Sequence, residues 1–146
     1  ELYHQIRKLQ EKRGLTGLTL HGEIDKRAHS EFSPDDRKNP DFVFHTPGTM
    51  EKNAIVIEVK GSIERERNGI SKDLKTLIKF VKKYGYQIGV LIVYNHGLSE
   101  LIRKHKELFE ECNGIQKEIM ERILILCKKE RQALEQTQLW EIMGNA

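Results

Sequence analysis

Apolar positions recur with helical spacing in three segments of the chain. Serines that can cap a helix N-terminus, Ser71 and Ser99, open two of these segments. Gly14 and Gly85 follow the ends of the first two and are typical helix stops. The spacing i, i+3, i+4, i+7 therefore predicts helices over residues 2–13, 71–84 and 99–112.

Other segments show the patterns of strands. Residues 16–25 alternate, with Leu18 and Leu20 on one predicted face and polar side chains on the other. Two later runs, residues 88–94 and 123–127, are almost continuously apolar, as expected of strands covered on both faces. The predicted strands are residues 16–25, 41–45, 54–60, 88–94 and 123–127.

The order of these elements predicts the fold class. The first three strands follow one another through short connections and are expected to pair antiparallel, whereas the later strands alternate with helices and can pair in parallel. We therefore expect an α/β (α+β) fold, a mixed β-sheet of about five strands flanked by helices. The length of 146 residues fits a single domain over residues 1–146. In the tail after Lys128, we expect Leu139, Trp140 and Ile142 to pack onto this body.

The strand over residues 54–60 carries candidate chemistry at its end. Side chains alternate along a strand, so Glu58 and Lys60 project from the same face. Burying such charged groups is costly unless they are paired or hold an ion. If this strand forms a hairpin with the strand that Asp41 opens, the Asp41 and Glu58 carboxylates lie side by side. Two carboxylates suit a hard divalent cation such as Mg²⁺, with Lys60 beside it to stabilise charge on a phosphate.

The same residues carry a family resemblance. Pro40-Asp41, a gap of sixteen residues, and Glu58-Val59-Lys60 after an apolar strand resemble the motif of the PD-(D/E)xK nuclease superfamily, whose fold is called restriction-endonuclease-like. The resemblance implies a nuclease that uses Mg²⁺ or Mn²⁺ to hydrolyse phosphodiester bonds, in DNA more often than in RNA. It makes Asp41, Glu58 and the Val59 carbonyl the metal ligands and Lys60 the catalytic lysine.

Many members of that superfamily add an acidic residue from an element before the Pro-Asp motif. Glu23 is our candidate, because it lies on the polar side of the first predicted strand. Glu1 and Glu11 on the first helix are competitors, and so is a residue upstream of the given sequence. The chain begins at Glu1, within what resembles the middle of a helix, so we expect it to be part of a longer protein.

Charge is informative only through its distribution. The net charge is +3, but residues 60–83 contain eight Lys or Arg against three Asp or Glu. A row of lysines on the helix over residues 71–84 is expected to contact nucleic-acid phosphates. An ordinary solvated helix face is the competing interpretation. The predicted phosphate contacts are Lys72, Lys75, Lys79 and Lys82.

Several alternatives stay open at this stage. Glu58 and Lys60 can also be interpreted as a surface ion pair. The chain as a whole can also be interpreted as a non-cleaving nucleic-acid-binding or targeting module with the same fold, or as a domain that binds another protein. Most histidines are expected to be ordinary loop or strand-end residues, although His45 and His96 each end a strand and could border the site.

Two further features bear on location and assembly. Cys112 and Cys127 lie in apolar contexts without the spacing of a zinc site, and we expect reduced core thiols. No apolar run approaches the roughly 18 residues of a membrane span. We therefore expect a cytoplasmic protein without membrane contact, bound to nucleic acid and assembled as a homodimer or within a larger protein.

Overall fold

The computed structural model describes residues 2–14, 17–22, 40–46, 53–63 and 69–144. Within them the chain forms α1 (Leu2–Lys12), β1 (Thr19–Gly22), β2 (Phe42–His45), β3 (Asn53–Lys60), α2 (Gly69–Lys83), β4 (Ile88–Tyr94), α3 (Leu98–Lys104), α4 (Lys106–Glu111), the 3-10 turn η2 (Cys112–Gly114), α5 (Lys117–Met120), β5 (Ile123–Lys128), β6 (Glu135–Gln138) and α6 (Leu139–Gly144).

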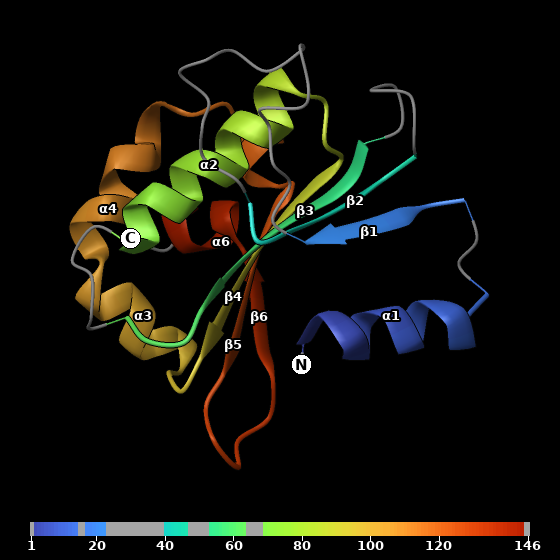
Figure 1. The fold of residues 1–146 in the computed structure, drawn as a ribbon. Helices are drawn as coiled ribbons and strands as arrows, with labels where there is room; N and C mark the ends of the chain where they lie inside the picture. The colour runs from blue at the N-terminus through green and yellow to red at the C-terminus, as the bar shows by residue number, and fades with distance from the viewer. Residues whose placement is uncertain (1, 15–16, 23–39, 47–52, 64–68, 145–146) are drawn as a thin grey trace.

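The strands form one mixed sheet in the order β1-β2-β3-β4-β5-β6. The pairs β1–β2, β2–β3 and β5–β6 are antiparallel, and β3, β4 and β5 run parallel. The predicted mixed α/β sheet flanked by helices is confirmed (Figure 1). The sixth strand, β6, and the helix α6 come from the tail, where sequence patterning predicted only packing. Leu139 and Ile142 do pack there, since both are buried.

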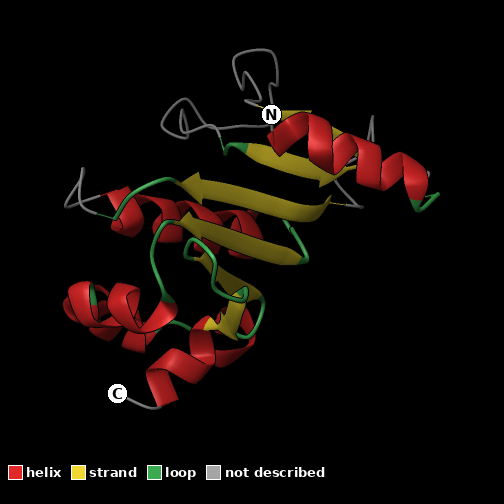
Figure 2. Cartoon of the chain, turned by 90° about the horizontal axis from the view of Figure 1, so that it is seen from below, coloured by secondary structure: helices red, strands yellow, loops and turns green. Residues whose placement is uncertain are grey.

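The two faces of the sheet are covered unequally. One face carries Val56, Leu91 and Ile125, which are fully buried against the layer that contains α2. On the other face the Tyr3 ring of α1 stacks on Phe42, with 6.3 Å between ring centroids. Figures 1 and 2 show α1 apart from all the other helices, across the sheet from them. The core therefore lies mainly between the sheet and α2–α6.

The predicted helix starts were partly wrong. Helix α2 begins at Gly69, so Ser71 lies inside it rather than at its N-cap. The N-cap of α3 is Gly97, not Ser99, and the Leu98 amide donates instead to the Glu135 carboxylate of β6 at 2.8 Å. The helix predicted over residues 99–112 is interrupted at His105, where φ is −120°. A cap supplied from a distant strand leaves no local signal in the sequence.

The register of the central strands places the candidate chemistry at one edge. Strands β3 and β4 are parallel, and Lys60 pairs with Val93 near the end of both strands. Polar residues that follow these two strands therefore meet at the same carboxyl-terminal edge of the sheet.

Candidate functional site

Pairing of β2 with β3 brings Asp41 and Glu58 together. Phe42 pairs antiparallel with Ile57, so Asp41 lies beside the next residues of β3. The Val59 amide donates to Asp41 Oδ2 at 2.7 Å, and the Asp41 amide donates to the Glu58 carboxylate. Each acid is therefore fixed by the other's strand, and the two acids meet as the predicted hairpin requires.

Glu58 occupies an unusual environment for a carboxylate. Its residue is only 6% exposed. Burial, followed by the negative charges of Asp73 and Asp41, raises the pKa of Glu58 to about 8, although Lys60 and the Asp41 amide act in the opposite direction. A carboxyl group with a pKa this high sits in a site with too little positive charge to stabilise its ionised form.

Lys60 reaches across to α2 rather than into solvent. Its Nζ lies 3.2 Å from Asp73 Oδ2, and the Asp73 side chain is 7% exposed. Burial raises the pKa of Asp73, and its ion pair with Lys60 counteracts that effect. The competing interpretation of a surface pair between Glu58 and Lys60 does not fit the structure, because Glu58 is buried and Lys60 contacts a buried acid on a helix.

Sequence reasoning missed Asp73, although a signal for it existed. The residue falls at i+3 from Ile70 and i−4 from Leu77, within the apolar stripe of α2 that packs on the sheet. A carboxylate on the core-facing stripe of a helix is costly unless it has a partner, and such a position identifies a functional candidate.

The charges of this cluster favour a cation. Among the described residues, the side chains of three acids, Asp41, Glu58 and Asp73, lie close together, and the Lys60 ammonium group contacts Asp73. Within the described part of the chain, no group of three or more His, Cys, Asp and Glu side chains is arranged to enclose a metal ion. The side chains that could hold a cation are therefore the two acids Asp41 and Glu58. Mg²⁺ sites often use only one or two protein carboxylates, because water and substrate phosphate supply the other ligands.

A groove opens beside this pair on the α1 side of the sheet. Its volume is about 900 Å³, and Asp41 and Val59 are among the residues that line it. Tyr3 and Arg7 of α1 contribute an aromatic ring and a positive charge, and Phe42, on which Tyr3 stacks, also lines it. A substrate in this groove would lie beside Asp41.

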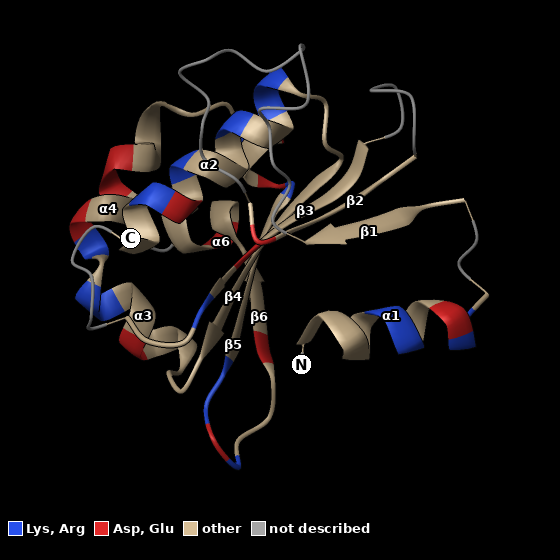
Figure 3. Cartoon of the chain, viewed as in Figure 1, with Lys and Arg blue, Asp and Glu red and all other residues tan. Residues whose placement is uncertain are grey.

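The predicted lysine row lies along α2, as Figure 3 shows. All four lysines are exposed, and Lys72 immediately precedes the Asp73 that contacts Lys60. Lys75 lies 3.8 Å from Glu111 of α4, an exposed pair of little energetic weight. Lys79 and Lys82 border a second groove. The row therefore begins at the carboxylate cluster and runs away from it.

The remaining candidates are placed unevenly. Glu23 and Glu1 lie outside the described residues, and Glu11 is exposed on α1. His45 lies against His21, with ring centroids 4.7 Å apart, near the far end of β2 from Asp41. His96 follows the carboxyl end of β4, on the same edge as Lys60. Cys112 and Cys127 are free and buried, as expected.

Comparison with known proteins adds no assignment: no family model, curated protein or solved structure matches this chain. Among the helices that the structure describes, none has the length and apolar character needed to cross a bilayer.

Proposed function

We propose that this protein is a metal-dependent nuclease that hydrolyses phosphodiester bonds in nucleic acid, with DNA favoured over RNA. The observation that carries the proposal is the convergence of Asp41, Glu58 and Lys60 at one sheet edge, with Glu58 buried in an excess of negative charge. The resemblance of these residues to the PD-(D/E)xK motif supports the same interpretation. Few purely structural roles require a buried acid whose pKa reaches about 8.

Each residue has a chemical role in this proposal. Asp41 and Glu58, with the Val59 carbonyl, would hold Mg²⁺ or Mn²⁺. The cation would polarise the scissile phosphate and lower the pKa of a bound water. Lys60 stabilises the negative charge that develops on the phosphate. Asp73 is a positioning residue, because its ion pair fixes the direction of the Lys60 side chain.

The metal site is tested through stability. A ligand that binds only the folded state raises its melting temperature. Mn²⁺ should therefore raise the Tm of the wild type at pH 8 and have little effect on Asp41→Asn, measured by differential scanning calorimetry. The same measurement with Ca²⁺, which does not change its oxidation state, is the control for oxidation by Mn²⁺. An equal rise in both proteins would place the bound ion elsewhere and remove the metal from the proposal.

The reaction is tested with labelled single-stranded and duplex DNA and RNA in Mg²⁺ or Mn²⁺. Lys60→Ala should lose cleavage by on the order of 10²-fold or more while it still binds substrate, because Lys60 acts on charge that develops only in the transition state. Lys129→Ala, an exposed lysine after β5, is the matched control and should cleave normally.

Two outcomes would change the assignment. Cleavage that persists in Lys60→Ala would arise from another site or a contaminant. A wild type that binds these substrates without cutting any of them would favour the binding module, since the lysine row of α2 supplies phosphate contacts without chemistry.

A further inference from the structure

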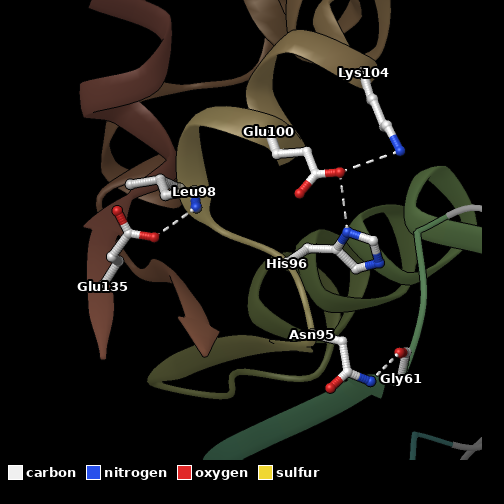
Figure 4. A network of polar contacts seen from close by, with 7 residues as sticks. All are labelled: Gly61, Asn95, His96, Leu98, Glu100, Lys104 and Glu135. Carbon is white, nitrogen blue, oxygen red and sulfur yellow. Dashed lines mark hydrogen bonds and ion pairs between the residues drawn. The ribbon is translucent and has the colours of Figure 1, made fainter. Parts of the chain in front are cut away.

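A second polar cluster lies on the same sheet edge as the carboxylates, just after β4. Asn95 adopts a left-handed backbone with φ of 66°, and its Nδ2 donates to the Gly61 carbonyl at 3.0 Å. Gly61 directly follows Lys60, and His96 directly follows Asn95. This hydrogen bond therefore ties the residue after the candidate lysine to the residue before His96 (Figure 4).

The imidazole of His96 is held in one orientation. Its Nδ1 lies 3.3 Å from Glu100 Oε1 of α3, and the His96 side chain is 12% exposed. Glu100 also contacts Lys104 at 3.3 Å. Hydrogen bonds from Lys104 and then His96 hold the pKa of Glu100 below its usual range, so it is a carboxylate that can only accept.

The tautomer follows from this contact. A carboxylate 3.3 Å from Nδ1 favours the neutral tautomer that carries its proton on Nδ1 and its basic lone pair on Nε2. In Figure 4 the Nε2 edge of the ring points away from Glu100. A carboxylate that orients a histidine in this way is a recurrent feature of catalytic and metal-binding imidazoles.

Lys60 is engaged by an acid of α2. Its Nζ lies 3.2 Å from Asp73 Oδ2. In the proposed function Lys60 supplies positive charge, and the hydrolysis still requires a group that takes the proton of the attacking water.

We propose that His96, oriented by Glu100, is the general base of the hydrolysis under "Proposed function", on which this inference rests. His96 Nε2 takes a proton from water while the water oxygen forms a bond to phosphorus. The bond from phosphorus to the leaving sugar oxygen breaks, and that oxygen keeps the electron pair and takes a proton from solvent. His96 then returns its proton to solvent, which leaves a phosphomonoester and an alcohol.

Charged groups on several elements lie near this edge of the sheet. Glu100 and Lys104 belong to α3, and Glu135 of β6 accepts from the Leu98 amide nearby. Lys60 lies across the strand edge. The experiment must therefore observe His96 directly rather than infer its state from rate alone.

The first measurement is independent of activity. Long-range ¹H–¹⁵N NMR of the imidazoles in the 146-residue chain should show His96 as the Nδ1-protonated tautomer at pH 8. Glu100→Gln should weaken the preference of His96 for the Nδ1-protonated form. His4→Asn removes an exposed histidine of α1 and serves as the control, since it should leave the His96 signal unchanged. An Nε2-protonated His96 in the wild type would overturn the inference whatever the enzyme does.

The second measurement is the pH–rate profile of the oligonucleotide that the wild type cuts best. His96→Asn keeps a polar group near Glu100 but cannot accept the proton, so kcat at pH 9 should fall about 10²-fold. The acid limb whose midpoint matches the NMR titration of His96 should also disappear. Oligonucleotide affinity in Ca²⁺ should change less than about threefold, because the general base acts on the reaction rather than on binding. Glu100→Gln retains His96 and should therefore lose a smaller part of kcat than His96→Asn. If His96→Asn does not fold, the kcat of Glu100→Gln still tests the proposal.

The two proposals fail differently. A wild type that cleaves nothing removes the proposed function and this inference with it. A wild type that cleaves, with His96→Asn retaining its kcat and pH profile, overturns the role of His96 alone and leaves Asp41, Glu58 and Lys60 in place.

Discussion

At the scale of single residues, Glu58 combines a structural cost with a functional position. The fold buries its carboxyl group beside two other acids, and one lysine offsets only part of that charge. Burial of this kind is tolerated when a protonated carboxyl or a bound cation removes the charge. Without a cation, the folded state retains a proton at Glu58 that the unfolded chain releases.

This retained proton gives a stability prediction with a definite sign. The pKa of Glu58 is about 8 in the folded state, against an ordinary value of 4.5 that applies to the unfolded chain. Its stabilising contribution is thus complete below pH 4.5 and is lost as pH rises toward 8. Without divalent ions, the wild type should lose about 1 kcal/mol of unfolding free energy per pH unit in this range, a few kcal/mol in all.

Glu58→Gln should remove most of that slope, because glutamine carries the same shape without the charge. Urea unfolding at pH 5, 6.5 and 8 measures the effect, and the variant should be the more stable protein at pH 8. A smaller slope of the same sign should remain, since the pKa of Asp73 is also raised. Parallel curves for the two proteins would show that Glu58 titrates normally. Saturating Mn²⁺ should abolish the advantage of Glu58→Gln.

The residue scale also shows what the sequence could reveal. The proximity of Asp41, Glu58 and Lys60 could be predicted because strand alternation and a hairpin need only local spacing. Asp73 was not, because its contact with Lys60 depends on how α2 packs on the strand edge. Glu100 was also missed, although it stands only four residues after His96. Glu23 lies outside the described residues, so its role stays a prediction.

At the scale of elements, α2 serves both the site and the core. Fifteen residues make it about 22 Å long, with Asp73 at the site end and lysines along its exposed side. Periodicity predicted an apolar stripe of Leu74, Leu77, Ile78 and Val81, and all of these are buried except Ile78, which is half-buried against the core. The break at His105 and the strand β6 were not foreseen, since both depend on contacts that are distant in sequence.

The lysine row should contribute electrostatic affinity for nucleic acid. Replacing Lys72 and Lys79 by glutamine should make the slope of log affinity against log salt shallower by about 1 to 2 units, with oligonucleotide binding measured in Ca²⁺. Lys106→Gln with Lys129→Gln, a pair of exposed lysines on other elements, is the matched control. An unchanged slope in the α2 variant would make the row a solvated face, the interpretation that charge alone left open.

Close packing of α2 on the sheet depends on Gly89 of β4. A Cβ at that position would lie 2.7 Å from Ile123 Cδ1 and 3.3 Å from Leu77 Cβ. The Ile123 side-chain end can move, but Leu77 Cβ is fixed to the helix backbone. Gly89→Ala should therefore destabilise the protein by about 1–3 kcal/mol in chemical denaturation, the usual range for overpacking. Gly61→Ala, where no atom lies within 4 Å of the added carbon, is the control.

At the scale of the whole molecule, the sheet divides a well-packed layer from a lightly covered one. Helices α2–α6 share one continuous core with the central strands. Helix α1, on the other face, has no buried residue, and Leu9 is 54% exposed. Its amphipathic pattern predicted a helix correctly, but pattern alone does not reveal how tightly a helix packs. The groove that Asp41 lines is formed in part by residues of this lightly packed helix.

This division predicts that α1 supports the substrate groove more than the fold. A chain of residues 17–146 should unfold cooperatively, with a loss of no more than about 2 kcal/mol, because it gives up few buried apolar contacts. Its affinity for oligonucleotides should fall, since Tyr3 and Arg7 leave the groove wall. The double variant Tyr3→Ala, Arg7→Ala in the full chain separates the two effects: it should reproduce the loss of binding while keeping the stability of the wild type. A truncated chain that binds normally would place the substrate elsewhere, and one that no longer unfolds cooperatively would make α1 part of the folding core.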